Sequence, residues 1–281
     1  MSLNSVNTNV GAMIALESLN RTNSDLAATQ KRVSTGYRVP DSTDDGAAYA
    51  VAQSVRSVVG GLTTANQQLG NVQGLLSTTQ SGLNDISNTM ASMRDVLVSL
   101  SDGNASTTTR AQYQTQYKSL LANIKTFLQD SNYGGKSLIG NFATDPYKAT
   151  AVNVVRNEAG ATYGIVSYNG SGLYASLALL SAASTAVAIA ALTKGGNFIS
   201  HSDTVGTQLN TVGSEITYVS NQIKFNSNRI DALNQGLGAL VDADLAKESA
   251  QLQSLQIRQQ LGTQALSLAN QAPQTLLSLF K

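Results

Sequence analysis

Side chains that commonly perform catalysis or bind metal ions are scarce in this chain. Among its 281 residues there is no cysteine, and the single histidine is His201. Without cysteine the chain forms no disulfide, zinc finger or catalytic thiolate, and one histidine excludes multi-histidine metal sites. His201 stands in the polar segment 197–204, with no Gly-x-Ser-x-Gly turn nearby. We therefore expect a solvated loop histidine and no serine triad.

Two short sequences carry part of the pattern of a ligand-binding loop. The string Gly134-Gly135-Lys136-Ser137 ends like a phosphate-binding loop, but Asp130 stands where that motif requires glycine, which predicts a turn. The pair Asp242-x-Asp244 begins like a calcium loop. Ala246 and Lys247 then replace the next ligand and glycine region, so we expect helix-terminal acids there.

The carboxylates Asp41, Asp44 and Asp45 are close enough in sequence to suggest general acid–base chemistry. They also directly precede a long apolar-periodic segment, where the positive end of a helix dipole favours negative charge. We therefore interpret them as residues of a helix N-terminus. Together these motifs predict no enzyme, no catalytic residue, no cofactor and no metal site.

Charge and hydropathy limit the partners. Lys and Arg number 18 against 17 Asp and Glu, so we expect no surface for nucleic acid. The first twenty residues contain no Lys or Arg, which is not the pattern of a secretory signal peptide. The uncharged segment Leu173–Leu192 is long enough to span a bilayer, but eight of its twenty residues are alanine. A packed Ala-rich helix or a pair of small-residue strands is the preferred interpretation.

A heptad repeat is the strongest structural signal. Alternating steps of three and four residues from Ala48 to Leu100 meet an apolar side chain at fifteen of sixteen positions, the exception being Thr79. Such a helix would be about 80 Å long, at ~1.5 Å per residue, and must therefore run along a rod. The sixteen positions are Ala48, Val51, Val55, Val58, Leu62, Ala65, Leu69, Val72, Leu76, Thr79, Leu83, Ile86, Met90, Met93, Leu97 and Leu100.

Two further segments repeat this spacing, from Tyr113 to Phe127 and from Val205 to Leu240. In the latter, Asn226 is the one polar residue of the stripe, and such a residue more often fixes register than binds a ligand. Three stripes of one period predict a mainly α fold, a long antiparallel helical bundle or coiled-coil rod. Between them, Ala149–Arg156 and Ala161–Tyr168 predict a small β-hairpin element in the middle of the chain.

The ends of the chain carry apolar stripes of their own, with nothing nearby in sequence to bury them. We expect these segments to pair with each other and with further copies of the chain. The predicted organisation is thus a terminal core of residues 1–40 and 242–281, a helical rod of 41–140 and 203–241, and a short outer region of 141–202. The predicted subunit contacts are Leu3, Val6, Val10, Leu19, Leu26, Val33, Leu261, Leu268, Leu276 and Phe280.

Both ends also resemble bacterial flagellin of the α-proteobacterial type. Residues 32–39 are similar to the family's basic residue followed by Leu-Ser-Ser-Gly, with Val33 for Leu and Thr35 for Ser. Residues 44–48 resemble the acidic-alanine start of its long helix, and residues 242–249 (Asp-Ala-Asp-Leu-Ala-Lys-Glu-Ser) the entry of its last helix. The chain closes with Lys281 where the family usually has Arg. The resemblance covers roughly residues 1–140 and 203–281.

The resemblance implies a structural subunit that is exported unfolded through the flagellar type III pathway and self-assembles into the extracellular filament used for motility. The implied partners are further copies of the chain, an export chaperone, and hook-junction and cap proteins, without nucleic acid or membrane insertion. A hook–filament junction protein is the nearest alternative, and a membrane-anchored coiled coil a more distant one. Some flagellins carry a metallopeptidase, but that needs His-Glu-x-x-His, and this chain has one histidine.

One helix surface is implied to matter for innate sensing. Residues 93–98 resemble the site that the animal flagellin receptor reads, and activating flagellins have Arg at the position of Ser92, Glu at Asp95 and Leu at Val96. Together with Arg94, these residues form the possible receptor surface. Because Ser92 lacks a bidentate donor, we expect weak or absent activation.

Overall fold

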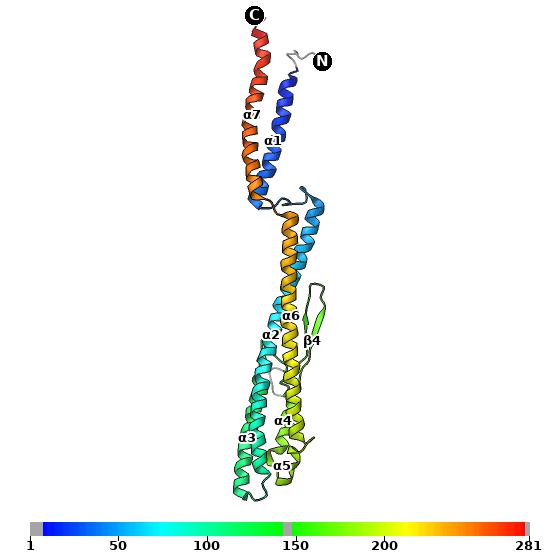
Figure 1. Cartoon of the computed structure of the whole chain (residues 1–281), viewed down its shortest axis with the longest axis vertical. Helices are drawn as coiled ribbons and strands as arrows, with labels where there is room; N and C mark the ends of the chain where they lie inside the picture. The colour runs from blue at the N-terminus through cyan, green and yellow to red at the C-terminus, as the bar shows by residue number, and fades with distance from the viewer. Residues whose placement is uncertain (1–7, 143–147, 279–281) are drawn as a thin grey trace. The chain divides into compact units, whose positions relative to one another are not determined.

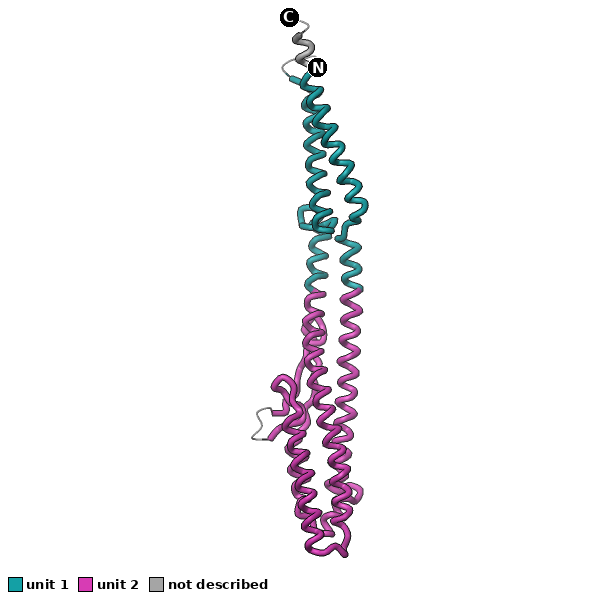
Figure 2. Tube along the Cα trace, turned by 90° about the vertical axis from the view of Figure 1, so that its left-hand side faces the viewer, with its two compact units in different colours: residues 1–57, 232–281 teal, residues 58–231 magenta. Residues whose placement is uncertain are grey.

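A computed structural model describes residues 8–142 and 148–278, with side chains as far as residue 271. These residues form seven α-helices, a short 3₁₀ turn and two small hairpins (Figure 1). The chain divides into two compact units, which Figure 2 colours separately: unit 1 comprises residues 1–57 and 232–281, and unit 2 residues 58–231. The helices are α1 (Val10–Thr35), α2 (Gly46–Leu100), α3 (Thr107–Asp130), α4 (Gly170–Ala178), α5 (Thr185–Leu192), α6 (Asn197–Val241) and α7 (Leu245–Ser278).

Unit 2 is an antiparallel bundle of α2, α3 and α6. The predicted heptad positions from Leu69 to Leu100 line its core: Leu83, Ile86 and Leu97 have no exposed surface, and Met90 and Met93 have 1% or less. Fully burying an aliphatic side chain of this size contributes roughly 1.5–3 kcal/mol relative to leaving it in water. The mainly α bundle predicted from the heptads is therefore confirmed. The heptad prediction is wrong for Val51, near the start of α2, which is 54% exposed.

The second helix of this bundle, α3, begins after Ser106, whose hydroxyl accepts a hydrogen bond from the Thr109 amide over 3.1 Å. Its Tyr117 is fully buried and donates its hydroxyl to the Leu177 carbonyl over 3.0 Å, which fastens α4 onto α3. Burial raises the pKa of Tyr117 well above its ordinary value of 10.0.

Two antiparallel hairpins lie between α3 and α4. Strands β1 (Asn132–Tyr133) and β2 (Lys136–Ser137) are joined by Gly134 and Gly135, whose φ angles of 57° and 80° suit glycine in a tight turn. This confirms a turn at the predicted place. Strands β3 (Val152–Val155) and β4 (Thr162–Ile165) pair Val152 with Ile165 and Val155 with Thr162, which confirms the predicted hairpin.

The alanine-rich segment 173–192 is not one continuous element. It contains most of α4, a 3₁₀ turn (Leu179–Ala182) and α5, and the chain turns to extended backbone at Ala183 before Ser184 caps α5. Within the described residues, no helix is both long and apolar enough to cross a membrane. The three short pieces pack Leu173, Leu180 and Ala188, respectively, into the core of unit 2.

The loop predicted around His201 is wrong. His201 lies in α6, which begins directly after Gly195 (φ 80°) and Gly196 and fixes its first turn by burying Phe198. The imidazole is half-buried, and burial lowers its pKa. The polar composition of 197–204 hid this helix start because its one large apolar anchor, Phe198, stands among polar residues.

Candidate assembly surface

The helices α1 and α7 run antiparallel and side by side in unit 1 (Figure 1). Their order follows from three contacts: Asn9 Nδ2 donates to the Ala269 carbonyl (2.7 Å), Gln259 Nε2 donates to Asn23 Oδ1 (2.7 Å), and Arg32 lies 3.6 Å from the Glu248 carboxylate. The two ends of the chain thus pack against each other, although the stripe through Leu261 and Leu268 does not line the contact.

Small side chains occupy much of the seam between these helices. Ala12, Ala15 and Thr22 on α1 are half-buried, as are Gly262 and Ala269 on α7. A Cβ atom on Gly262 would approach Leu19 Cδ1 to 3.1 Å, so the backbones are close there. Leu255, with 4% of its surface exposed, is the best-buried large side chain of α7. The described part of the seam thus combines small side chains with a buried leucine and with half-buried large apolar groups.

Large apolar side chains of the same two helices remain in water. We define the outer apolar set as Met13, Ile14 and Leu16 of α1 and Ile257, Leu261 and Leu268 of α7. Their exposed fractions run from 47% for Leu16 to 71% for Leu268. Exposed large apolar groups in such number on two paired helices are candidates for contact with another protein.

The predicted subunit contacts separate into several groups in the structure. Leu19, Leu26 and Val33 are half-buried on α1, in the seam with α7. Val10, 41% exposed, Leu261 and Leu268 point into solvent. Leu3, Val6 and Phe280 lie outside the described residues, and Leu276 lies on α7 with its side chain outside them.

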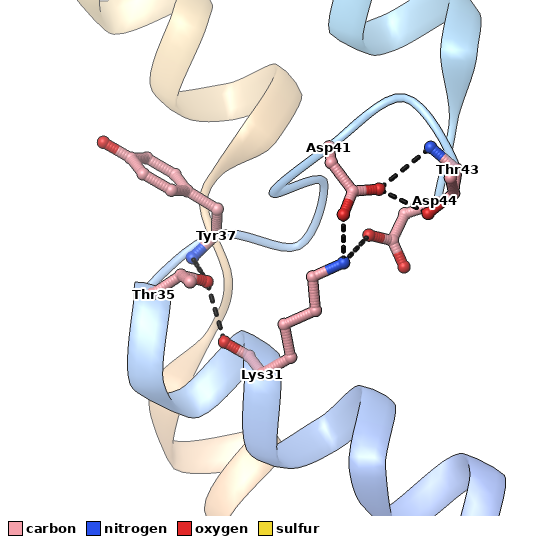
Figure 3. Close-up of polar contacts among 6 residues, drawn as sticks. All are labelled: Lys31, Thr35, Tyr37, Asp41, Thr43 and Asp44. Carbon is pink, nitrogen blue, oxygen red and sulfur yellow. Dashed lines mark hydrogen bonds and ion pairs between the residues drawn. The ribbon is translucent and has the colours of Figure 1, made fainter.

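The turn that joins α1 to α2 is closed by one lysine and two aspartates (Figure 3). The Lys31 ammonium donates to the carboxylates of both Asp41 and Asp44, the latter over 3.0 Å. Asp41 also accepts from the Thr43 amide (2.9 Å) and hydroxyl (2.5 Å). The hydrogen bond from Lys31 and those from Thr43 hold the pKa of Asp41 well below its usual range.

The interpretation of all three aspartates as helix-terminal acids is therefore wrong for two of them. Only Asp45 accepts from a first-turn amide of α2, that of Ala48, over 3.0 Å. Asp41 and Asp44 pair with Lys31 because α1 ends before Gly36, with φ 74°, and the loop that follows brings residues 41–44 beside Lys31. Contacts made across a loop leave no periodic pattern in the sequence, so the pairing of Lys31 with these aspartates could not be predicted from spacing.

The same turn is attached to the link between α6 and α7. The amide of Ala243 donates to the Gly36 carbonyl, the amide of Arg38 donates to the Val241 carbonyl, and Tyr37 forms a β-bridge with Asp242. The Arg56 guanidinium lies 5.5 Å from the centroid of the Tyr37 ring, within the range of a cation–π contact. The motif at 32–39 thus joins the two halves of unit 1.

At the start of α7, Asp244 Oδ1 accepts from the amides of Ala246 (3.0 Å) and Lys247 (3.2 Å), which confirms a helix cap at the place of the apparent calcium loop. Among the residues that the structure describes, no three His, Cys, Asp or Glu side chains are grouped as metal ligands.

Three of the four residues of the possible receptor surface are exposed on α2, namely Ser92, Arg94 and Asp95. Val96 is 5% exposed and belongs to the core of unit 2, so the prediction that it contributes to a surface is wrong. Its position, between the heptad residues Met93 and Leu97, turns it inward together with Leu97.

Comparison with known proteins identifies the family. Residues 6–144 match the model of the bacterial flagellin N-terminal helical region, and residues 199–280 that of the C-terminal helical region. Flagellin FljK of Caulobacter vibrioides is 32% identical over 281 residues, 100% of each chain. Flagellin of Brucella melitensis is 35% identical over 297 residues, 99% of each chain. The alignment with a crystal structure of Bacillus cereus flagellin includes 66% of this chain and 94% of the Bacillus chain, at 17% sequence identity and a TM-score of 0.34.

Long helices, paired terminal helices and two small hairpins define a mainly α protein of elongated helices. The chain belongs to the bacterial flagellin family. It is a structural subunit of the flagellar filament, the organelle of motility, and proteins of this family are structural and not enzymes.

Proposed function

We propose that this chain self-assembles into the helical filament through the outer apolar set of α1 and α7. The observation that carries the proposal is the exposure of six large apolar side chains on the two helices that come from the ends of the chain. Covering them with a second copy removes apolar surface from water, at roughly 25 cal/mol per Å². A head-to-tail contact of this kind does not close on itself, so it generates an open helical assembly.

The test is a charge placed on the outer apolar set. Leu268→Asp changes a side chain that is 71% exposed, so the monomer should keep its helix content and melting temperature. It should no longer pellet as filaments, because assembly would bury an unpaired carboxylate. The control, Ser87→Asp, adds the same charge to an exposed position of α2 in unit 2 and should assemble normally. Filaments from Leu268→Asp at wild-type yield would refute the proposal.

A trimmed chain provides the second arm. Residues 41–241 retain the core of unit 2 but lack α1 and α7, so this fragment should remain helical and melt cooperatively without forming filaments. The full chain under the same conditions is the control. Polymerisation of the fragment would show that the terminal helices are dispensable.

Export of the unfolded chain through the flagellar type III pathway is the second part of the proposal. A chain without cysteine avoids disulfide traps, and 102 of its 281 residues are Ser, Thr, Asn or Gln, which keeps an extended chain soluble. An export chaperone, hook-junction proteins and a cap protein are the further partners that we propose. In cells without the flagellar export apparatus the chain should stay inside, whereas parental cells should release it into the filament.

The nearest alternative is a hook–filament junction protein. The curated relatives reported above are named flagellins, and both family models are those of flagellin. Electron microscopy of the polymerised protein distinguishes the two functions, since a filament subunit should give long filaments and a junction protein short collars.

A further inference from the structure

A buried carboxyl group lies beneath the β3–β4 hairpin of unit 2. Glu215 of α6 is 6% exposed, and its carboxyl group lies within range of the Val166 amide, directly after β4. One of its oxygens, Oε2, is buried and has no hydrogen-bond partner. Next to it, the ring of Tyr163 on β4 stacks on that of Tyr218 on α6, with centroids 4.0 Å apart.

Among the described residues, no Lys, Arg or His forms an ion pair with Glu215, and the nearest cations along the surrounding elements, Lys136, Arg156 and Lys224, are exposed. The stretches 57–84 of α2, 149–155 with β3, 161–169 with β4 and 204–223 of α6 contain no Lys, Arg or His. The titratable groups that face Glu215 are the phenols of Tyr163 and Tyr218, and Lys148, ahead of β3, is exposed. An ionised carboxylate in such a place is costly unless it is paired.

The tip of the hairpin is attached differently. Glu158, between the strands, forms a bidentate pair with Arg229 of α6 at 3.0 and 2.5 Å, and the Arg156 carbonyl accepts from Asn226 and Gln222. The pair with Arg229 lowers the pKa of Glu158 below its usual 4.5, so this tip contact is complete above that pH. The two ends of the hairpin therefore differ in their response to protons.

We propose that Glu215 makes docking of the hairpin stem on α6 proton-dependent: the stem is held when the carboxyl is neutral and loosens when it ionises, while the tip stays clamped by Arg229. Burial raises the pKa of Glu215 above its usual 4.5, which agrees in direction. For a carboxyl whose pKa is higher in the docked state, docking is strongest below the undocked value. It weakens as the pH rises from about 4.5 to the raised value and is constant above it.

The test follows hydrogen exchange of the full chain by mass spectrometry between pH 5 and pH 8, expressed as protection factors. In the wild type, protection of peptides covering residues 150–168 should fall over this range. The protection factor should fall roughly tenfold for each unit by which the pKa of Glu215 is higher in the docked state than in the undocked state. Glu215→Gln, which keeps an acceptor for the Val166 amide, should abolish the fall. Asp203→Asn, an exposed position of the same helix, should behave as the wild type.

An independent readout needs no variant. The Val166 amide proton, which lies within range of the Glu215 carboxyl, should shift in NMR spectra with a midpoint above 4.5. A midpoint at or below that value would overturn the proposal. An identical pH dependence of protection in Glu215→Gln and wild type would overturn it as well.

Discussion

Asn226 of α6 donates a hydrogen bond to Asn66 of α2 over 2.9 Å, inside a seam that is mostly apolar. Asn226 is fully buried, also donates to the Arg156 carbonyl over 3.0 Å, and accepts from Gln222. One side chain thus links two helices and the β3–β4 hairpin at a single level of unit 2. The pairing fixes the relative register of the two helices, because sliding either by one turn would leave these polar groups unpaired.

The first prediction concerns this residue. Asn226→Ala removes the donor from two acceptors, and we expect it to lower the free energy of unfolding by about 1–3 kcal/mol. Urea unfolding followed by circular dichroism measures the change. The control is Asn228→Ala, an exposed position two residues along the same helix, which should stay within about 0.5 kcal/mol of wild type. Equal losses in the two variants would contradict a register role.

The second prediction concerns the heptad core. Leu83→Asp places a carboxylate at a position with no exposed surface, which costs several kcal/mol. We expect the melting temperature to fall by roughly 10 °C or more. Ser87→Asp adds the same group to the exposed side of α2 and should leave the melting curve nearly unchanged. Identical melting temperatures for these variants are incompatible with the bundle described above.

The third prediction concerns the turn between α1 and α2. Lys31→Met removes the cation that donates to Asp41, so the pKa of the Asp41 carboxyl should rise toward its ordinary value. Because that pKa is lowered in the fold, the contact contributes stability above the ordinary value of 3.8 and loses it as the pH falls below. NMR titration of the side-chain carboxyl measures the shift. Lys247→Met, an exposed cation of α7, serves as the control and should leave the Asp41 titration unchanged.

The fourth prediction concerns the animal flagellin receptor, and it rests on the family resemblance. Ser92 is exposed on α2 and has no guanidinium to offer a bidentate contact, so we expect weak or absent activation of reporter cells. Ser92→Arg should increase the response, because its neighbours Arg94 and Asp95 are also exposed. Ser87→Arg adds the same charge outside the segment and should not. A full response to the unmodified chain would refute this prediction.

Much of the helical fold follows from periodicity. The heptad placed Leu83, Ile86 and Leu97 in the core, because a repeat of alternating three and four residues keeps one face of a helix inward whatever its partner is. The hairpin followed from two β-like runs flanking a turn sequence at 157–160. Both patterns involve residues that are close together in the sequence, so they can be recognised without knowledge of the tertiary contacts.

The side chains of the terminal helices were harder to assign. Helix α7 carries large apolar groups on more than one side, so its periodicity does not say which side meets α1. Leu255 is buried in the seam while Leu261 and Leu268 are exposed, although the stripe through the latter two is the more regular one. The Lys31 contacts depend on the path of the loop between α1 and α2, and the burial of Glu215 depends on a hairpin that packs on α6. Neither arrangement produces a regular residue spacing that could be recognised in the sequence.

The outer apolar set of α1 and α7 has a consequence for how free energy is distributed in the monomer. The seam gains apolar burial from Leu255 and from the half-buried Leu19 and Leu26, whereas the leucines, isoleucines and methionine of the outer apolar set keep their hydration shells. Folding of the single chain therefore does not gain the hydrophobic free energy of the outer apolar set on the terminal helices. This free energy is gained only when another molecule covers the side chains of the outer apolar set and removes them from water.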